Sequence, residues 1–192
     1  MNIQEIKNRN QIIKYIEKLQ DPVICEVGTR NGDFFYDRML SDNCKLGIIV
    51  DIWQDTGDLH QNDNAYPQEE LDSQYQKVFQ RTLNYPNVKI IREFSHKACN
   101  FFSNETFDFV YIDADHSYEG CLRDLNCWYP KIKRGGILAG HDFISPELTV
   151  RMGHKTVFGV IQAVKEFLQT NNITDKLIHI TPEMYGTYFI RK

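Results

Sequence analysis

Hydrophobic residues along the chain fall into short runs that alternate with helical patterns. Five near-continuous apolar runs predict strands buried on both faces, at residues 23–27, 46–52, 88–92, 107–113 and 137–140. Apolar residues at helical spacing predict amphipathic helices at residues 1–20, at 68–84, along Leu122, Leu125, Trp128 and Ile132, and along Phe158, Ile161, Val164 and Leu168. This alternation predicts a parallel sheet with helices on both faces.

The last two apolar runs differ from the others because a short link separates them. Residues 176–180 and 185–190 are joined through TPEM, which permits an antiparallel hairpin but not a parallel crossover. No linker or internal repeat divides the chain, so residues 1–192 are expected to form one domain. The polar segment 53–66 follows the second strand at the sheet edge where ligands bind, although a plain surface excursion is the alternative.

Composition disfavours several classes of protein. The chain has 192 residues and a net charge of −4, which argues against a nucleic-acid partner whose phosphates need Lys and Arg. No apolar run approaches the roughly 20 residues that span a bilayer, so no membrane partner is expected. The start MNIQEIKNRN lacks a signal-peptide stretch, and the five cysteines are odd in number without a C-x-x-C pair. We therefore expect a cytoplasmic protein with reduced cysteines.

The segment EVGTRNG (residues 26–32) follows the first predicted strand. Its glycines, Gly28 and Gly32, let the backbone turn tightly and approach a ligand closely. Their spacing differs from the G-x-G-x-x-G fingerprint, which disfavours pyrophosphate, and an ordinary strand–turn–helix is the alternative. Asp51 ends the second strand roughly 20 residues later, where an acid can accept both hydroxyls of a ribose or simply cap a helix. Together these features favour a cofactor that carries adenosine.

Polar clusters follow the fourth and fifth predicted strands. Asp113, Asp115 and His116 lie in IDADHS, and His141 and Asp142 lie in ILAGHDF. If these parallel strands are neighbours, both clusters meet in one crevice, where close carboxylates repel one another unless a proton, a donor or a cation intervenes. A divalent metal with oxygen ligands is one answer. The alternative is a helix cap at Asp115 or the following serine, with His116 in a solvent-facing loop.

Four parts of the sequence share a pattern with one family: EVGTRNG, the acid Asp51, IDADHSYEGCLRDLNCWYPKIKRGG and ILAGHDF. They resemble class I S-adenosylmethionine-dependent methyltransferases, and within that family they are similar to the small O-methyltransferase domains of the macrocin and sugar-modifying kind. The resemblance extends over nearly the whole chain. It implies a Rossmann-like, doubly wound, mainly parallel seven-stranded α/β sheet with an antiparallel C-terminal hairpin.

The resemblance also implies a role for each matching residue. The implied contacts of S-adenosylmethionine are Glu26, Gly28, Thr29, Arg30, Gly32, Asp51, Ile52, Ser95, His96 and Asp113. Asp51 would hold the ribose hydroxyls, and residues 95–96 would flank the adenine. The implied ligands of a divalent metal such as Mg²⁺ are Asp113, His141 and Asp142, a set in which the imidazole also suits softer ions. Asp115 resembles the general base of sugar-specific members, with His116 as a second candidate.

These residues predict a metal-assisted O-methyltransferase that acts on a small acceptor such as a sugar, a nucleotide-sugar or a phenol. Loops 53–66 and 143–156 would form the acceptor pocket. The alternatives are a non-catalytic cofactor-binding protein of the same fold and a nicotinamide-dependent oxidoreductase. A nucleic-acid methyltransferase would carry Asn-Pro-Pro or Pro-Cys, which the chain lacks. The edge hairpin would suit a homodimer through its aromatic residues Tyr185, Tyr188 and Phe189.

Overall fold

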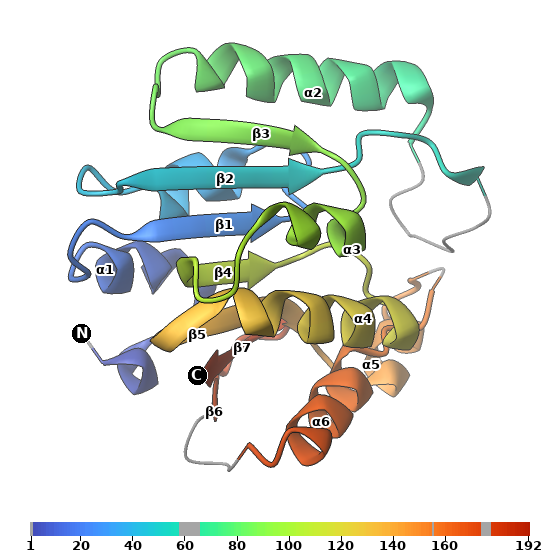
Figure 1. The fold of residues 1–192 in the computed structure, drawn as a ribbon. Helices are drawn as coiled ribbons and strands as arrows, with labels where there is room; N and C mark the ends of the chain where they lie inside the picture. The colour runs from blue at the N-terminus through green and yellow to red at the C-terminus, as the bar shows by residue number, and fades with distance from the viewer. Residues whose placement is uncertain (1, 58–65, 155, 174–177) are drawn as a thin grey trace.

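A seven-stranded sheet forms the centre of the protein, in the order β3-β2-β1-β4-β5-β7-β6 (Figure 1). The computed structural model describes residues 2–57, 66–154, 156–173 and 178–192. Strands β1 to β5 are parallel, whereas β7 runs antiparallel to β5 and β6, so the predicted fold class is confirmed. The strands are β1 Val23–Val27, β2 Leu46–Asp51, β3 Val88–Arg92, β4 Phe107–Ile112, β5 Ile132–Phe143, β6 Ile178–Ile180 and β7 Gly186–Arg191.

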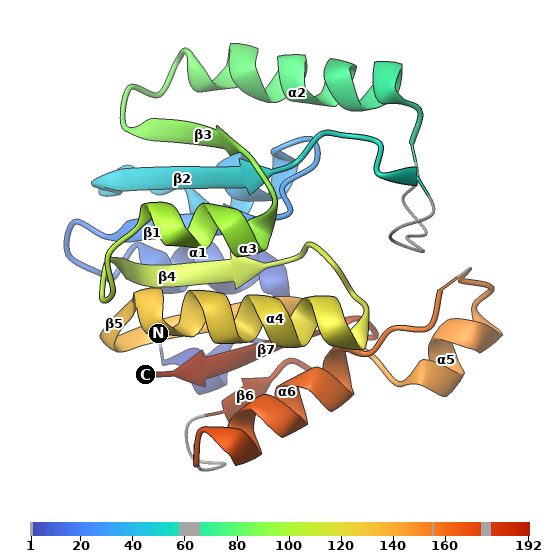
Figure 2. The ribbon, with the colours of Figure 1, turned by 45° about the vertical axis from the view of Figure 1, so that its right-hand side comes forward.

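Both faces of the sheet are buried. Successive residues of a strand point to opposite sides, so each strand contributes side chains to both cores. In β1, Cys25 and Val27 pack into one core cluster and Ile24 packs into the other. Helices α3, α4 and α6 cover the first face, and the N-terminal segment, η3 and α2 cover the second (Figures 1 and 2). These helices are α2 Gln68–Thr82, α3 Ser95–Ala98, α4 Tyr118–Trp128, α6 Val160–Thr170 and the π-helical turn η3 Phe35–Met39.

The N-terminal segment is not the single helix that the pattern predicts for residues 1–20. It consists of two 3₁₀ turns, η1 (Ile3–Glu5) and η2 (Arg9–Gln11), and the short helix α1 (Ile12–Ile16). Asn8 precedes η2 with an extended backbone (φ −156°, ψ 161°), which interrupts the helix. Ile3, Ile6, Ile12 and Ile16 are nevertheless buried in the core, whereas Ile13 is half-buried. The apolar spacing therefore identifies the buried face correctly and the continuous helix wrongly.

Strand β5 and the connections near the site depart from the predicted boundaries. β5 spans Ile132–Phe143 rather than only the predicted residues 137–140, and Gly135 continues the strand at a φ of +81°. The candidate loop 143–156 contains a helix, α5 (Pro146–Arg151), which projects beyond the carboxyl ends of the parallel strands (Figure 2). Within the candidate loop 53–66, positions 58–65 lie outside the described residues.

The cysteines correct the expectation of a fully reduced protein. Cys99 of η5 (Cys99–Phe101) and Cys127 of α4 form a disulfide, with their Cα atoms 6.1 Å apart. They are separated by 28 residues in the sequence, and the packing of neighbouring helices brings them together, so cysteine number and spacing could not reveal the pair. Cys25, Cys44 and Cys121 are buried thiols.

The C-terminal hairpin carries its aromatic residues inward. Tyr188 and Phe189 are each 1% exposed and belong to the two core clusters. Of the three rings named for a homodimer, these two are therefore not surface residues and Tyr185 is half-buried, and the homodimer itself stays a prediction. No described helix has both the length and the apolar composition that a bilayer crossing demands.

Candidate active site

A cavity of about 560 Å³ opens at the carboxyl ends of β1, β2, β4 and β5, the edge where open α/β folds bind ligands. Gly32 does not line it. Its φ is +75°, and a Cβ there would lie 3.2 Å from Tyr36 and Val78, so this glycine serves the turn rather than the cavity. The other residues predicted for the site all line the cavity: Glu26, Gly28, Thr29, Arg30, Asp51, Ile52, Ser95, His96, Asp113, Asp115, His116, His141 and Asp142.

Gly28 directly follows β1, and its backbone passes very close to the residues that follow the neighbouring parallel strand β4. This close approach of the two backbones is called the Gly28 crossing here. Its φ of +86° is a left-handed conformation that L side chains rarely adopt. A Cβ there would lie 2.2 Å from the carbonyl oxygen of Asp113 and 2.6 Å from the Cα of Ala114. The Gly28 N–H donates to the Val50 carbonyl over 2.8 Å, and the Asp113 N–H donates to the Val27 carbonyl over 2.7 Å. The close crossing therefore requires glycine.

Two acids with raised pKa values lie beside this crossing. Glu26 is 1% exposed, and burial raises the pKa of its carboxyl to about 8, even though the Thr29 hydroxyl donates to it. Asp51 accepts the backbone N–H groups of Arg30 over 2.8 Å and of Trp53 over 3.0 Å, while burial raises its pKa. Arg30 and Trp53 take φ values of 52° and 40°. The loops after β1 and β2 are thus shaped around one carboxylate.

A further buried acid, Asp124 of α4, lines the cavity next to Ser95. Asp124 is 1% exposed, and burial raises its pKa to about 7 although Ser95 hydrogen-bonds to it. The Ser95 hydroxyl oxygen also accepts the indole N–H of Trp128 over 2.9 Å. Sequence reasoning missed Asp124, because an acid between the apolar positions of a helix gives no sign that tertiary packing buries it.

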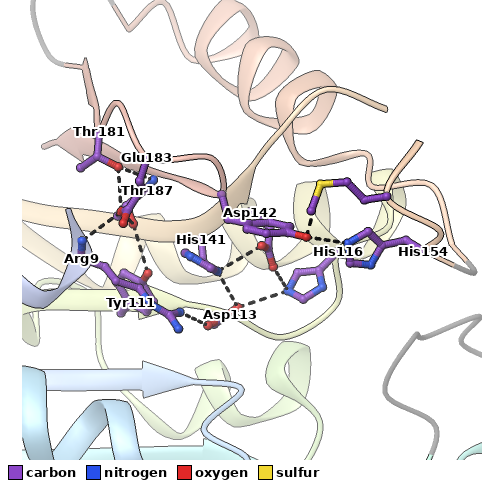
Figure 3. A network of polar contacts seen from close by, with 12 residues as sticks. Arg9, Tyr111, Asp113, His116, His141, Asp142, His154, Thr181, Glu183 and Thr187 are labelled. Atoms are coloured by element: carbon purple, nitrogen blue, oxygen red, sulfur yellow. Dashed lines mark hydrogen bonds and ion pairs between the residues drawn. The ribbon is translucent and has the colours of Figure 1, made fainter. Parts of the chain in front are cut away.

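Four titratable side chains, here called the acidic cluster, meet at the ends of β4 and β5: Asp113, His116, His141 and Asp142 (Figure 3). His116 Nε2 lies 3.2 Å from Asp113 Oδ1 and 3.0 Å from Asp142 Oδ2. His141 Nδ1 lies 3.1 Å from Asp142 Oδ1 and 3.7 Å from Asp113 Oδ1. Asp113, His141 and Asp142 each present a ligand atom within 4.8 Å of the others. The two motifs predicted to converge do lie together.

Opposed charges shift the pKa values within the acidic cluster. Burial lowers the pKa of His116, but the hydrogen bonds and charges of Asp113 and Asp142 outweigh burial and raise it to about 10. Burial raises the pKa of Asp142, but the hydrogen bonds and charges of His116 and His141 hold it well below its usual range. Asp142 also takes a φ of +57°, a conformation that costs a non-glycine residue energy and is typical of functional sites.

Asp115 combines the two positions that sequence reasoning treated as alternatives. Its Oδ1 accepts the backbone N–H of Ser117 over 2.9 Å, and the Arg123 guanidinium lies 3.7 Å from Oδ2. The side chain packs against Gly120, where a Cβ would lie 2.1 Å from the Asp115 carboxyl carbon. Asp115 therefore braces the start of α4 while its side chain forms part of the cavity wall, and Ser117 is the helix cap.

Arg9 and Tyr185 complete the cavity from segments outside the recognised motifs. Arg9 Nη1 donates to Asp113 Oδ2 over 3.3 Å, and its guanidinium carbon lies 5.0 Å from the centre of the Phe34 ring. The Tyr185 ring stacks on His141 with centroids 6.3 Å apart, and its hydroxyl hydrogen-bonds to His154 Nε2 over 2.8 Å. Sequence reasoning missed both residues, because no local pattern marks a side chain that reaches a site through tertiary folding.

Comparisons with a family model and with solved structures both relate the chain to methyltransferases, the first by family and the second by fold. Residues 25–143 match a family described as a methyltransferase domain. This segment runs from β1 to the end of β5, so it contains the acidic cluster but neither Arg9 nor Tyr185. No curated protein sequence matches the chain.

Solved structures share the fold at low identity. A Clostridium thermocellum protein named as an rRNA methylase matches with a TM-score of 0.66 and 17% identity, over 97% of each chain. A Streptococcus mutans methyltransferase in complex with SAH matches with a TM-score of 0.62 and 14% identity, over 97% of this chain and 99% of the other. Spermidine synthase from Thermotoga maritima matches with a TM-score of 0.60 and 13% identity, over 96% of this chain but 58% of the synthase. These likenesses concern the fold alone.

Proposed function

Because the chain belongs to the methyltransferase-domain family, whose class I members use S-adenosylmethionine, we propose a specific reaction for it. It transfers the methyl group of S-adenosylmethionine to a hydroxyl oxygen of a small acceptor, a sugar, a nucleotide-sugar or a phenol, with the assistance of a divalent cation. One observation carries this proposal: Asp113, His141 and Asp142 converge in the same cavity that the Gly28 crossing and Asp51 line.

The cofactor half of the cavity suits S-adenosylmethionine. The whole cavity, of about 560 Å³, has a volume typical of small-molecule sites. Asp51 ends β2, where a carboxylate can accept the ribose hydroxyls. Glu26 has a pKa raised to about 8, and a cationic group of the cofactor nearby would favour its ionised form. The cofactor supplies an already activated methyl group, so the task of the protein is to align the acceptor oxygen with it.

The donor set of the acidic cluster suits a divalent cation. Adjacent ligands at about 2.1 Å in octahedral geometry are about 3 Å apart. His141 Nδ1 lies 3.1 Å from Asp142 Oδ1, close to that spacing. Two carboxylates with one imidazole accommodate Mg²⁺, Mn²⁺ or a softer ion. The chemistry that such an ion supplies when bound is a lower pKa for the acceptor hydroxyl.

Asp115 is the residue that we favour for accepting the hydroxyl proton, a step that typically contributes about 10²–10⁴-fold. Both Asp115 and His116 line the cavity. His116 Nε2, however, already hydrogen-bonds to Asp113 and lies 3.0 Å from Asp142 Oδ2, so this ring nitrogen is engaged by the two carboxylates. Its first role is then to bridge the two carboxylates.

A methyl-transfer assay tests the proposal directly. S-adenosylmethionine is combined with a panel of nucleotide-sugars, free sugars and phenols, in Mg²⁺, Mn²⁺ or a chelator. We expect transfer to a hydroxyl oxygen that the chelator abolishes. Undiminished transfer in the chelator would remove the cation from the mechanism, and transfer to amines alone would overturn O-methylation.

Calorimetry separates the methyltransferase from the two alternatives, an oxidoreductase and a non-catalytic cofactor-binding protein. Calorimetry with S-adenosylmethionine, S-adenosylhomocysteine and NAD should show tight binding of the first two. Tight binding of NAD alone would favour an oxidoreductase, whereas cofactor binding without any transfer would favour a non-catalytic protein.

Asp115→Asn should lower transfer by about 10²–10⁴-fold and leave S-adenosylhomocysteine affinity nearly intact. Full activity in that variant would contradict the assignment of Asp115 as the base.

A further inference from the structure

A polar network connects the C-terminal hairpin with the acidic cluster (Figure 3). It begins at Glu183, between β6 and β7, and passes through Thr187 of β7 to Tyr111 of β4. Arg9 then connects the network to Asp113: its backbone N–H bonds to Glu183, its guanidinium interacts electrostatically with Tyr111, and its Nη1 donates to Asp113. Glu183 lies outside the cavity wall, yet it stands at the start of a continuous chain of polar contacts that ends on an acid of the site.

The Glu183 carboxylate gathers three donors on a single oxygen. Its Oε1 accepts the backbone N–H of Arg9 over 2.9 Å, the Thr181 hydroxyl over 2.9 Å and the Thr187 hydroxyl over 3.2 Å. Thr181 and Thr187 are 3% and 0% exposed, so water has little access to compete for these bonds. Glu183 Oε1 is the acceptor in both bonds, so each threonine directs its single hydroxyl proton toward Glu183.

The direction of every later bond follows from that constraint. Thr187 has already directed its proton to Glu183, so the buried Tyr111 hydroxyl must donate to Thr187 Oγ1 over 3.3 Å. The lone pairs of the Tyr111 oxygen are then left to the nearby Arg9 guanidinium, whose positive charge interacts with Tyr111. Arg9 Nη1 in turn donates to Asp113 Oδ2 over 3.3 Å. With Oδ2 engaged, Asp113 Oδ1 faces the two histidines of the acidic cluster.

We propose that Glu183 is a positioning residue for Asp113, acting through the ordered hydroxyls of Thr187 and Tyr111 and through Arg9. The same carboxylate fixes the Arg9 backbone, so one group holds both ends of the arginine. His179 Nε2 adds a bond of 2.7 Å to the carbonyl oxygen of Ile6 and fastens the N-terminal segment beside the hairpin. The inference rests on the proposed function, because it takes Asp113 as a ligand of the cation.

Thr187→Val tests the network, since valine keeps the shape of threonine and removes the hydroxyl. In the full chain, we expect calorimetric Mn²⁺ affinity to fall several-fold, less than the tenfold or more that losing a direct partner of a metal ligand costs, because Thr187 acts on Asp113 through intermediate residues. The kcat should fall by a similar factor while the KM for S-adenosylmethionine stays within about twofold, because the cofactor half is untouched.

Thr82→Val is the matched control. Its part-buried hydroxyl donates to the Val78 carbonyl in α2, which packs beside β3 at the far end of the sheet (Figure 1). The variant therefore loses a threonine hydroxyl but not the network, and its Mn²⁺ affinity should match that of the unaltered protein. Glu183→Gln keeps an acceptor oxygen and should retain most of the affinity, whereas Glu183→Leu should lose it as Thr187→Val does.

The outcomes separate this inference from the proposed function. Unchanged Mn²⁺ affinity in Thr187→Val would overturn the positioning role and leave the proposed function standing. Absence of Mn²⁺ binding in the unaltered protein would overturn both the cation in the proposed function and the role of Glu183. If Thr187→Val does not fold, Tyr111→Phe breaks the network at its next member and is judged by the same criteria.

Discussion

The two halves of the cavity are built in different ways. The cofactor half is shaped mainly by backbone atoms. The Gly28 backbone lies close to the residues that follow β4, and Asp51 accepts the backbone N–H groups of Arg30 and Trp53. The acceptor half is assembled from side chains, with Asp113 held by Arg9, a residue 104 positions away in the sequence. Contacts along neighbouring strand ends can be read from a local motif, whereas contacts of such long range cannot. We therefore expect mutations that strain the backbone to disrupt the cofactor half, and mutations that remove a charge to disrupt the acceptor half.

The largest expected effect is in the cofactor half, from Gly28→Ala. The added Cβ would lie 2.2 Å from the Asp113 carbonyl oxygen, and the φ of +86° adds strain. We expect a loss of about 3–5 kcal/mol in the free energy of unfolding, measured by urea denaturation. S-adenosylhomocysteine binding, measured by calorimetry, should be lost with it.

Gly135→Ala is the matched control for that variant. Gly135 has a similar φ of +81°, but a Cβ there would meet nothing within 4 Å. It should lose about 1–2 kcal/mol from the left-handed conformation alone and retain cofactor binding. Equal losses in the two glycine variants would show that backbone strain rather than the crossing dominates.

In the acceptor half, the next largest effect is expected from Asp142→Asn. Asparagine tolerates the positive φ of 57° at this position, so the change removes charge with little change in shape. Methyl transfer and Mn²⁺ affinity should each fall about 10–100-fold or more, while S-adenosylhomocysteine affinity is retained. Asp108→Asn is the control, because Asp108 pairs with Lys133 over 2.7 Å and does not line the cavity. A parallel loss of cofactor affinity in Asp142→Asn would erase the distinction between the halves.

A smaller effect, on pH dependence, is expected at Asp124. Burial raises the pKa of this carboxyl from 3.8 to about 7, so the folded state keeps a proton that the unfolded chain releases. The stabilisation from this proton is fully present below pH 3.8 and is lost as the pH rises to about 7. When urea denaturation is measured at pH 5 and at pH 7, the free energy of unfolding should therefore fall by about 2 kcal/mol more in the unaltered protein than in Asp124→Asn. Identical pH profiles would mean that the carboxyl is already ionised in the folded state.

The strands show how much of this fold can be predicted from sequence. The run at residues 23–27 is apolar almost without interruption because β1 is covered by helices on both faces, and its predicted and observed bounds agree. Helical spacing was a weaker guide in the N-terminal segment, since spacing reports which residues are buried and not whether the backbone stays helical. There, the extended backbone of Asn8 breaks the helix.

The site divides along the same line. Asp51, Asp113 and Asp142 could be predicted because each lies at the carboxyl end of a buried strand, and parallel strands end at one edge. Arg9, Asp124 and Glu183 could not, because each owes its position to packing between segments distant in the sequence. The family resemblance assigns Gly32 to the cofactor, although it does not line the cavity and a Cβ there would meet Tyr36 and Val78. A motif identifies residues that a turn requires without separating those that touch a ligand from those that shape the turn.

The hydrogen bond between the Arg9 N–H and Glu183 joins residues 174 positions apart, and both lie outside the segment 25–143 that matches the family. The two flanking segments are therefore joined to each other across the matched segment, and the position of each depends on the other. A chimera that replaced only one of them would lose the bond between Arg9 and Glu183. A chimera that replaced both could keep an equivalent pair, while the acidic cluster would stay with the matched segment.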